Sequence, residues 1–144
     1  MSKKFWVGVI LVFIAWNVLN IVIHGILLTR AYESDAMMKV FRPDMQSKMW
    51  IFYIVAAVCS FFLTLIFSKW YKGRGLVEGV QFGVYSGFLM ATPMAYSSYA
   101  MYPIPSSVVF QWFVYGMIHY LIIGVILGLI FGKKEIQAAA PPAA

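Results

Sequence analysis

Long apolar stretches and short polar breaks alternate along this chain. Four stretches, at about residues 5–29, 49–68, 76–96 and 108–131, each contain at most one charged residue. A helix needs roughly 20 residues to cross a hydrocarbon core of ~30 Å. The pattern therefore predicts an all-α integral membrane protein, with a four-helix bundle over residues 1–132. We expect the remaining residues, 133–144, to form a low-complexity cytoplasmic tail.

Small residues recur every four positions along the third stretch and again along the fourth. Rows of this kind let helix backbones approach closely, which is the usual means of helix association in lipid. We predict glycine-zipper packing made by Gly75, Gly79, Gly83, Gly87, Gly124, Gly128 and Gly132. A second row on the second stretch consists of Ala56, Ser60, Thr64 and Ser68. The connection from span two to span three is short, so we expect this row to face the glycines of span three.

Polar side chains within the spans form a candidate pocket. On the first span, Asn17, Asn20 and His24 share one face within about 60°. Polar groups at such depth face protein or water rather than lipid. The whole candidate set is Asn17, Asn20, His24, Tyr85, Gln111, Tyr115 and His119. It predicts either a hydrated or ligand-binding pocket or a group of interhelical hydrogen bonds, and the sequence leaves both readings open.

Composition and charge support a membrane location. The chain is 62% hydrophobic, whereas a soluble domain is nearer ~45–50% apolar. Its net charge of +6 indicates no nucleic-acid partner, because the basic residues lie at span ends. Seven lie on one side (Lys3, Lys4, Lys69, Lys72, Arg74, Lys133 and Lys134), and four on the other (Arg30, Lys39, Arg42 and Lys48). By the positive-inside rule, we expect both termini to be cytoplasmic in a bacterial inner membrane.

No catalytic residue, metal site or cofactor is predicted. A haem or chlorin held through His24 or His119 is an alternative, but the two depths differ by about 10 Å, so the pair is not expected to share one iron. Four methionines resemble a copper-thioether set, although methionine also fills interfacial helices. They are Met37, Met38, Met45 and Met49. Glu78 could relay protons or could pair structurally with Arg74 one turn away.

Short segments throughout the chain resemble an uncharacterised family of small four-span bacterial inner-membrane proteins, described only as a domain of unknown function. The resembling segments are His24-Gly25-x-Leu-Leu28, Arg42-Pro43-x-Met45, Glu78-Gly79-x-x-Phe-Gly83, Pro93-Met94 and Pro103-Ile-Pro105. The resemblance implies a four-span topology and a bacterial source. It carries no catalytic assignment.

Spans three and four each present two faces unsuited to lipid, so a square four-helix bundle leaves one such face per helix uncovered. We therefore expect the partners to be membrane lipid together with larger membrane-complex subunits or further copies of the chain. The leading hypothesis is a non-catalytic accessory or structural subunit of a larger inner-membrane complex, for example an energy-transducing one. The alternatives are a small homo-oligomeric transporter or channel that uses the polar pocket, and a haem- or pigment-binding membrane subunit. On the leading hypothesis, His24 and His119 are structural.

Overall fold

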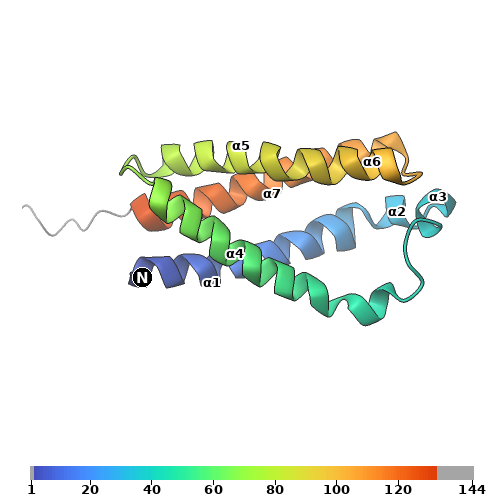
Figure 1. The fold of residues 1–144 in the computed structure, drawn as a ribbon, viewed down its shortest axis with the longest axis horizontal. Coiled ribbons are helices and arrows are strands. Elements are labelled where there is room, and N and C mark those ends of the chain that lie inside the picture. Colours follow the sequence, from blue (N-terminus) through green and yellow to red (C-terminus); the bar gives the residue numbers. More distant parts are fainter. Residues whose placement is uncertain (1, 133–144) are drawn as a thin grey trace, which may run out of the picture.

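The protein is all-helical in a computed structural model that describes residues 2–132 (Figure 1), and no strand occurs among those residues. The predicted tail lies outside the described residues. Helix α1 (Lys3–Val22) continues as a π-helical segment, η1 (Ile23–Leu27). The connection that follows holds two single-turn helices and a 3-10 turn: α2 (Thr29–Tyr32), α3 (Asp35–Met38) and η2 (Met45–Lys48). The remaining elements are α4 (Trp50–Trp70), α5 (Leu76–Thr92), π-helical η3 (Pro93–Ser97), α6 (Ser98–Met101) and α7 (Ser106–Gly132).

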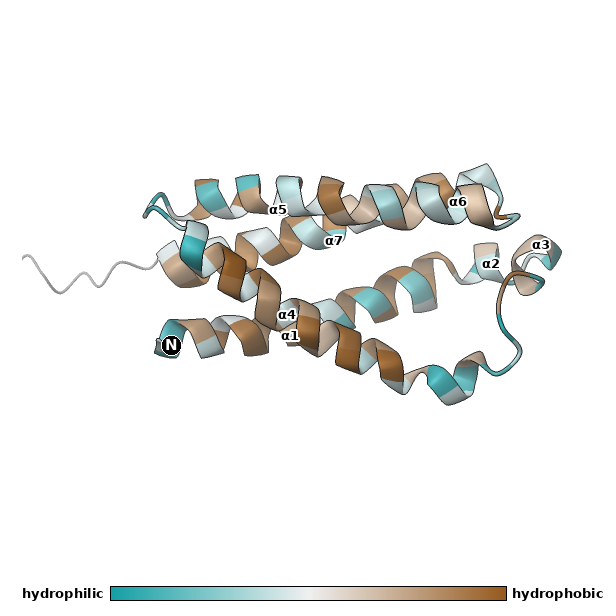
Figure 2. Ribbon diagram, viewed as in Figure 1, coloured by the Kyte–Doolittle hydropathy of each residue, from teal (hydrophilic) through white to brown (hydrophobic). Residues whose placement is uncertain are grey.

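Among residues 2–132, three helices are long and apolar enough to cross a membrane: Lys3–Leu27, Met45–Trp70 and Ser106–Gly132. The predicted class of all-helical membrane protein is confirmed to that extent. Helix α5 differs, because it has 17 residues and carries Glu78 and Gln81 in its first two turns. Figure 2 shows teal and white turns along α5, whereas the middle of α4 is mainly brown. At Pro93 the ring removes one backbone donor, and the helix changes to π geometry there.

Helices α5 and α7 pack along their lengths through glycine (Figure 1). A Cβ built on Gly79 would overlap the carbonyl oxygen of Gly124 and would lie 2.7 Å from Cα of Gly128. A Cβ on Gly83 would lie 2.8 Å from Cα of Leu121. At the end of the row, a Cβ on Gly132 would lie 2.8 Å from Cα of Gly75. Only hydrogen at these positions allows the two backbones to touch.

The small-residue row of α4 does not face the glycines of α5, so that part of the prediction is wrong. Ala56, Ser60 and Thr64 are buried, but Thr64 packs against α1, where its Cγ2 would lie 2.9 Å from a Cβ on Gly8. The glycine row of α5 is occupied by the backbone of α7. The short connection keeps the end of α4 close to the start of α5, but it does not determine which faces of the two helices are in contact.

Two hydrophobic clusters hold the helices together. The larger lies between α1, α4, α5 and α7 and contains Val12, Trp16, Ala56, Phe67, Phe82, Tyr120, Ile123 and Leu127. The smaller lies at the α3 end of the molecule and contains Met37, Ala95, Ile104, Val108 and Val109. Met37 is fully buried there, whereas Met38 is 65% exposed.

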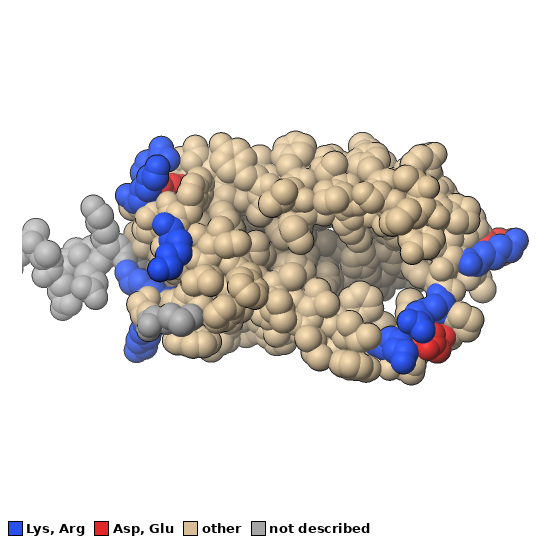
Figure 3. Space-filling model, viewed as in Figure 1, with Lys and Arg blue, Asp and Glu red and all other residues tan. Residues whose placement is uncertain are grey.

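Basic residues collect at the two ends of the molecule, and the face drawn in Figure 3 is free of charge between them. Helix α1 begins at the same end as the turn from α4 to α5 and the end of α7 (Figure 1). Toward the α3 end, α4 leans away from α1, and a hollow opens between the two helices (Figure 3).

Candidate functional site

The polar residues of α1 and α7 fall into common layers. The Trp16 ring lies 4.7 Å from the His119 ring, edge to face. Eight residues after Trp16, in η1, His24 is linked to Trp112 by the hydroxyl of Tyr32. The two helices therefore run antiparallel, with Trp16 level with His119 and His24 level with Trp112. Halfway between these links, Asn20 is level with Tyr115.

His24 is held by a hydrogen-bond chain that reaches α7. Its Nδ1 lies 2.5 Å from the hydroxyl oxygen of Tyr32, and Nε1 of Trp112 donates to the same oxygen at 2.7 Å. Burial raises the pKa of Tyr32 to about 12, although the Trp112 hydrogen bond acts in the opposite direction. Trp112 donates to this oxygen, and Nδ1 is the one acceptor that residues 2–132 offer the hydroxyl, so we assign the phenol proton to the Tyr32–Nδ1 hydrogen bond. The hydrogen of the neutral imidazole is then on Nε2.

The backbone around His24 is itself unusual. His24 and Gly25 lie within the π-helical segment η1, and π-helical turns occur frequently at functional sites. The extra residue in the turn directs the chain toward α2, which supplies Tyr32. The sequence analysis missed both Tyr32 and Trp112. The detectable signal was that a tyrosine lies eight residues after His24, just beyond the span.

His119 has a different environment from His24. Its side chain is only 5% exposed, and it packs against the rings of Trp16 and Tyr120. Its Nε2 is buried and has no hydrogen-bond partner among residues 2–132. The same residues contain no group of three or more His, Cys, Asp and Glu side chains suited to a metal ion.

We expect His119→Leu to raise the free energy of unfolding by about 1 kcal/mol, because it removes an unpaired buried polar atom and conserves side-chain volume. His24→Leu should lower it by a similar amount, about 1 kcal/mol, because the Tyr32 hydroxyl loses its acceptor. Thermal unfolding of the purified variants in one detergent measures both. If His119→Leu is the more damaging change, the imidazole has a partner or a function beyond packing.

The other predicted pocket residues divide into two groups. The Asn17 amide donates to the carbonyl of Phe13 in its own helix, at 2.8 Å. Asn20, Gln111 and Tyr115 are half-buried, and their side chains make no hydrogen bond to the described part of the chain. Tyr85 does not join the group: it is 63% exposed, and its ring lies edge-on to Trp70 with centroids 6.3 Å apart. The structure therefore links His24 to α7 through Tyr32, and the grouping of the other residues into one pocket stays a prediction.

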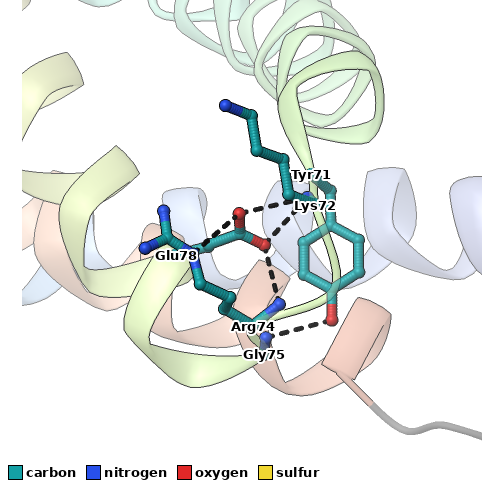
Figure 4. A network of polar contacts seen from close by, with 5 residues as sticks. All are labelled: Tyr71, Lys72, Arg74, Gly75 and Glu78. Carbon is teal, nitrogen blue, oxygen red and sulfur yellow. Dashed lines mark hydrogen bonds and ion pairs between the residues drawn. The ribbon is translucent and has the colours of Figure 1, made fainter.

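Glu78 closes the turn between α4 and α5 (Figure 4). Its carboxylate accepts hydrogen bonds from the backbone amide of Lys72 at 2.9 Å and from that of Arg74 at 3.0 Å. The expected ion pair with Arg74 is confirmed at 3.5 Å. The Tyr71 hydroxyl accepts a hydrogen bond from the amide of Gly75 at 3.1 Å. This network orders a turn in which Gly73 and Gly75 have positive φ, and the arrangement supports a structural role for Glu78.

These features define an all-helical membrane protein in which the Tyr32 hydroxyl links His24 to Trp112 of α7. Comparison with known protein families, with curated proteins and with solved structures finds no match to this chain. The resemblance to the four-span bacterial family therefore stays a prediction.

Proposed function

We propose that this chain is a non-catalytic accessory subunit of a larger bacterial inner-membrane complex, and that the outer face of α5 is where the larger subunits bind. On this proposal α5 is the fourth span, and its glycine-zipper contact with α7 holds it in the membrane. Both termini are cytoplasmic, as the distribution of basic residues indicates.

The exposure of Tyr85 carries the proposal. Tyr85 lies near the middle of the continuous helical path from Leu76 to Met101, yet it is 63% exposed. Leu89, one turn further, is 72% exposed, and Tyr96 is 45% exposed. A hydroxyl near the middle of the hydrocarbon is disfavoured in contact with lipid, whereas it finds partners in a protein interface. Tyrosine is enriched at protein interfaces for the same reason.

The low hydropathy of α5 supports the same conclusion. A lipid-facing helix is apolar on its exposed surface, as the exposed side chains Ile10, Val18 and Ile66 are on α1 and α4. The exposed surface of α5 instead mixes hydroxyl-bearing and apolar side chains, and Gln81 is half exposed. This helix is therefore the one in the bundle whose outer face is best suited to protein.

Site-specific photo-crosslinking in native membranes tests the proposal. We expect a benzophenone side chain at position 85 to give a discrete adduct with a different, larger membrane protein. The same group at position 18, where Val18 is 53% exposed on α1, should react with lipid only. If position 85 gives no protein adduct, the proposal is overturned.

The second candidate function is the small homo-oligomeric transporter or channel. The observation that favours it is that Asn20, Gln111 and Tyr115 have no side-chain partner among the described residues. In the crosslinking experiment this candidate predicts an adduct with twice the mass of the chain, which would replace the accessory-subunit proposal.

A further inference from the structure

The core-facing stripe of α4 loses its cover toward the α3 end. Its buried residues, Ala56, Ser60, Thr64 and Phe67, are spaced by three or four residues. The same spacing continues the stripe outward to Phe52 and Tyr53, which are 54% and 56% exposed. All residues from Trp50 to Val55 are exposed, so residues 2–132 leave much of the surface of this part of α4 uncovered. The inward surface of α4 is thus available to another molecule.

Helix α1 supplies the opposite surface. An apolar groove of about 200 Å³, lined by Val9, Ile10, Phe13 and Ala57, marks the place where α1 and α4 begin to separate. Continuing the stripe of Val9 and Phe13 at helical spacing gives Asn17, Asn20 and His24. This face of the first span is therefore apolar where it contacts α4. It is polar further along, where α4 has moved away from it. We call the space between them, with the groove at its narrow end, the α1–α4 wedge.

A hydrogen-bond donor lies on the polar part of this face of the first span, as helical spacing places it. Nδ1 of His24 is occupied by Tyr32, which leaves Nε2–H as a donor with no acceptor among the described residues. Asn20, one turn away on the same face, has an amide without a partner. Two polar groups one turn apart can both bind one oxygen acceptor or two acceptors on a small ring.

The depth of this pair limits the kind of acceptor. Lys4 and Arg30 flank the apolar part of α1, and Asn17 lies halfway between them. At 1.5 Å per residue, Asn20 is about 5 Å and His24 about 10 Å from that level. The hydrocarbon extends about 15 Å from its midplane. Both donors therefore lie within the hydrocarbon. A charged acceptor is costly to place at this depth, so the acceptor is an uncharged oxygen on an apolar molecule.

We propose that the α1–α4 wedge binds a membrane-soluble quinone, with a ring carbonyl oxygen accepting from His24 Nε2 and Asn20, and the apolar tail in the groove beside Phe13. The aromatic side chains Phe52 and Tyr53 on α4 offer the flat ring a stacking surface. The space opens sideways to lipid, so the ligand enters from the bilayer. The wedge is on α1 and α4, away from the outer face of α5, and the proposal is independent of the accessory-subunit function.

Other occupants fit less well. A phospholipid ester carbonyl lies at the edge of the hydrocarbon, about 5 Å beyond the level of His24. An acyl chain would leave both donors unpaired, which is costly in a dry environment. A partner helix would need acceptors at two adjacent levels, and its bulk is not suited to the narrow end of the wedge, where α1 and α4 are in contact.

Native mass spectrometry of the full chain released from detergent tests the proposal, with decylubiquinone as the probe. We expect one saturable molecule per chain. His24→Phe and Asn20→Leu should each weaken binding about tenfold or more, the equivalent of one lost hydrogen bond in a dry site. Gln81→Leu on α5 is the matched control and should bind as the parent chain does. Two variants on the same stripe protect the test against the misfolding of one, and thermal unfolding of each verifies that it is folded.

Three results would overturn the proposal. One is that decylubiquinone binds equally to the parent chain and to both folded stripe variants. Another is that added phosphatidylglycerol displaces the quinone mole for mole, which would make the wedge a phospholipid site. The third is that no adduct forms at any probe concentration.

Discussion

Gly79→Ala is expected to separate α5 from α7 and to lower the free energy of unfolding by about 3 kcal/mol, the upper end of overpacking costs. The added methyl would overlap the carbonyl of Gly124 and meet Cα of Gly128 at 2.7 Å. These are backbone atoms, so no rotamer change relieves the overlap. The gain of about 1 kcal/mol in helix propensity from glycine to alanine does not offset it. Gly124→Ala should behave in the same way, because its methyl would meet Cα of Gly83 at 2.7 Å.

Gly87→Ala is the matched control, because it makes the same chemical change in the same row. The nearest atom to its Cβ would be Sδ of Met117 at 3.1 Å, at the end of a flexible side chain that can move. We expect a change within about 1 kcal/mol. Thermal unfolding in detergent and the elution volume in size exclusion measure all three variants. Equal losses for Gly79→Ala and Gly87→Ala would show that close backbone approach does not stabilise the pair.

Periodicity predicted faces of helices well, but it did not predict partners. The four-residue spacing identified the glycines of α5 and α7, and the structure places them in contact with one another. The same spacing identified Ala56, Ser60 and Thr64 on α4, but they pack toward α1 rather than α5. A row of small residues predicts that the backbone of another helix approaches closely. Which helix comes close depends on the tilt and order of the whole bundle, and these are set by contacts distant in sequence.

The candidate site shows the same limit. Helical spacing grouped Asn17, Asn20 and His24 on one face, and this face now forms one side of the α1–α4 wedge. Tyr85 was added because its hydroxyl is polar and its depth is central, but depth does not say which way a side chain points. Tyr32 escaped notice because it lies beyond the span. Only the π-helical turn and the connection to α2 bring it back over His24.

Glu78→Ala is expected to open the turn between α4 and α5 and to lower the melting temperature by about 10 °C. The carboxylate has no exposed surface, and it satisfies the amides of Lys72 and Arg74. Alanine would leave both donors unpaired beside a buried methyl group. Arg74→Ala isolates the contribution of the ion pair: the guanidinium is 59% exposed and lies 3.5 Å from the carboxylate, so its removal should cost less than about 2 °C. Thermal unfolding of both variants measures the difference. A loss in Arg74→Ala as large as in Glu78→Ala would show that the charge pair, rather than the capping of the turn by Glu78, holds α4 and α5 together.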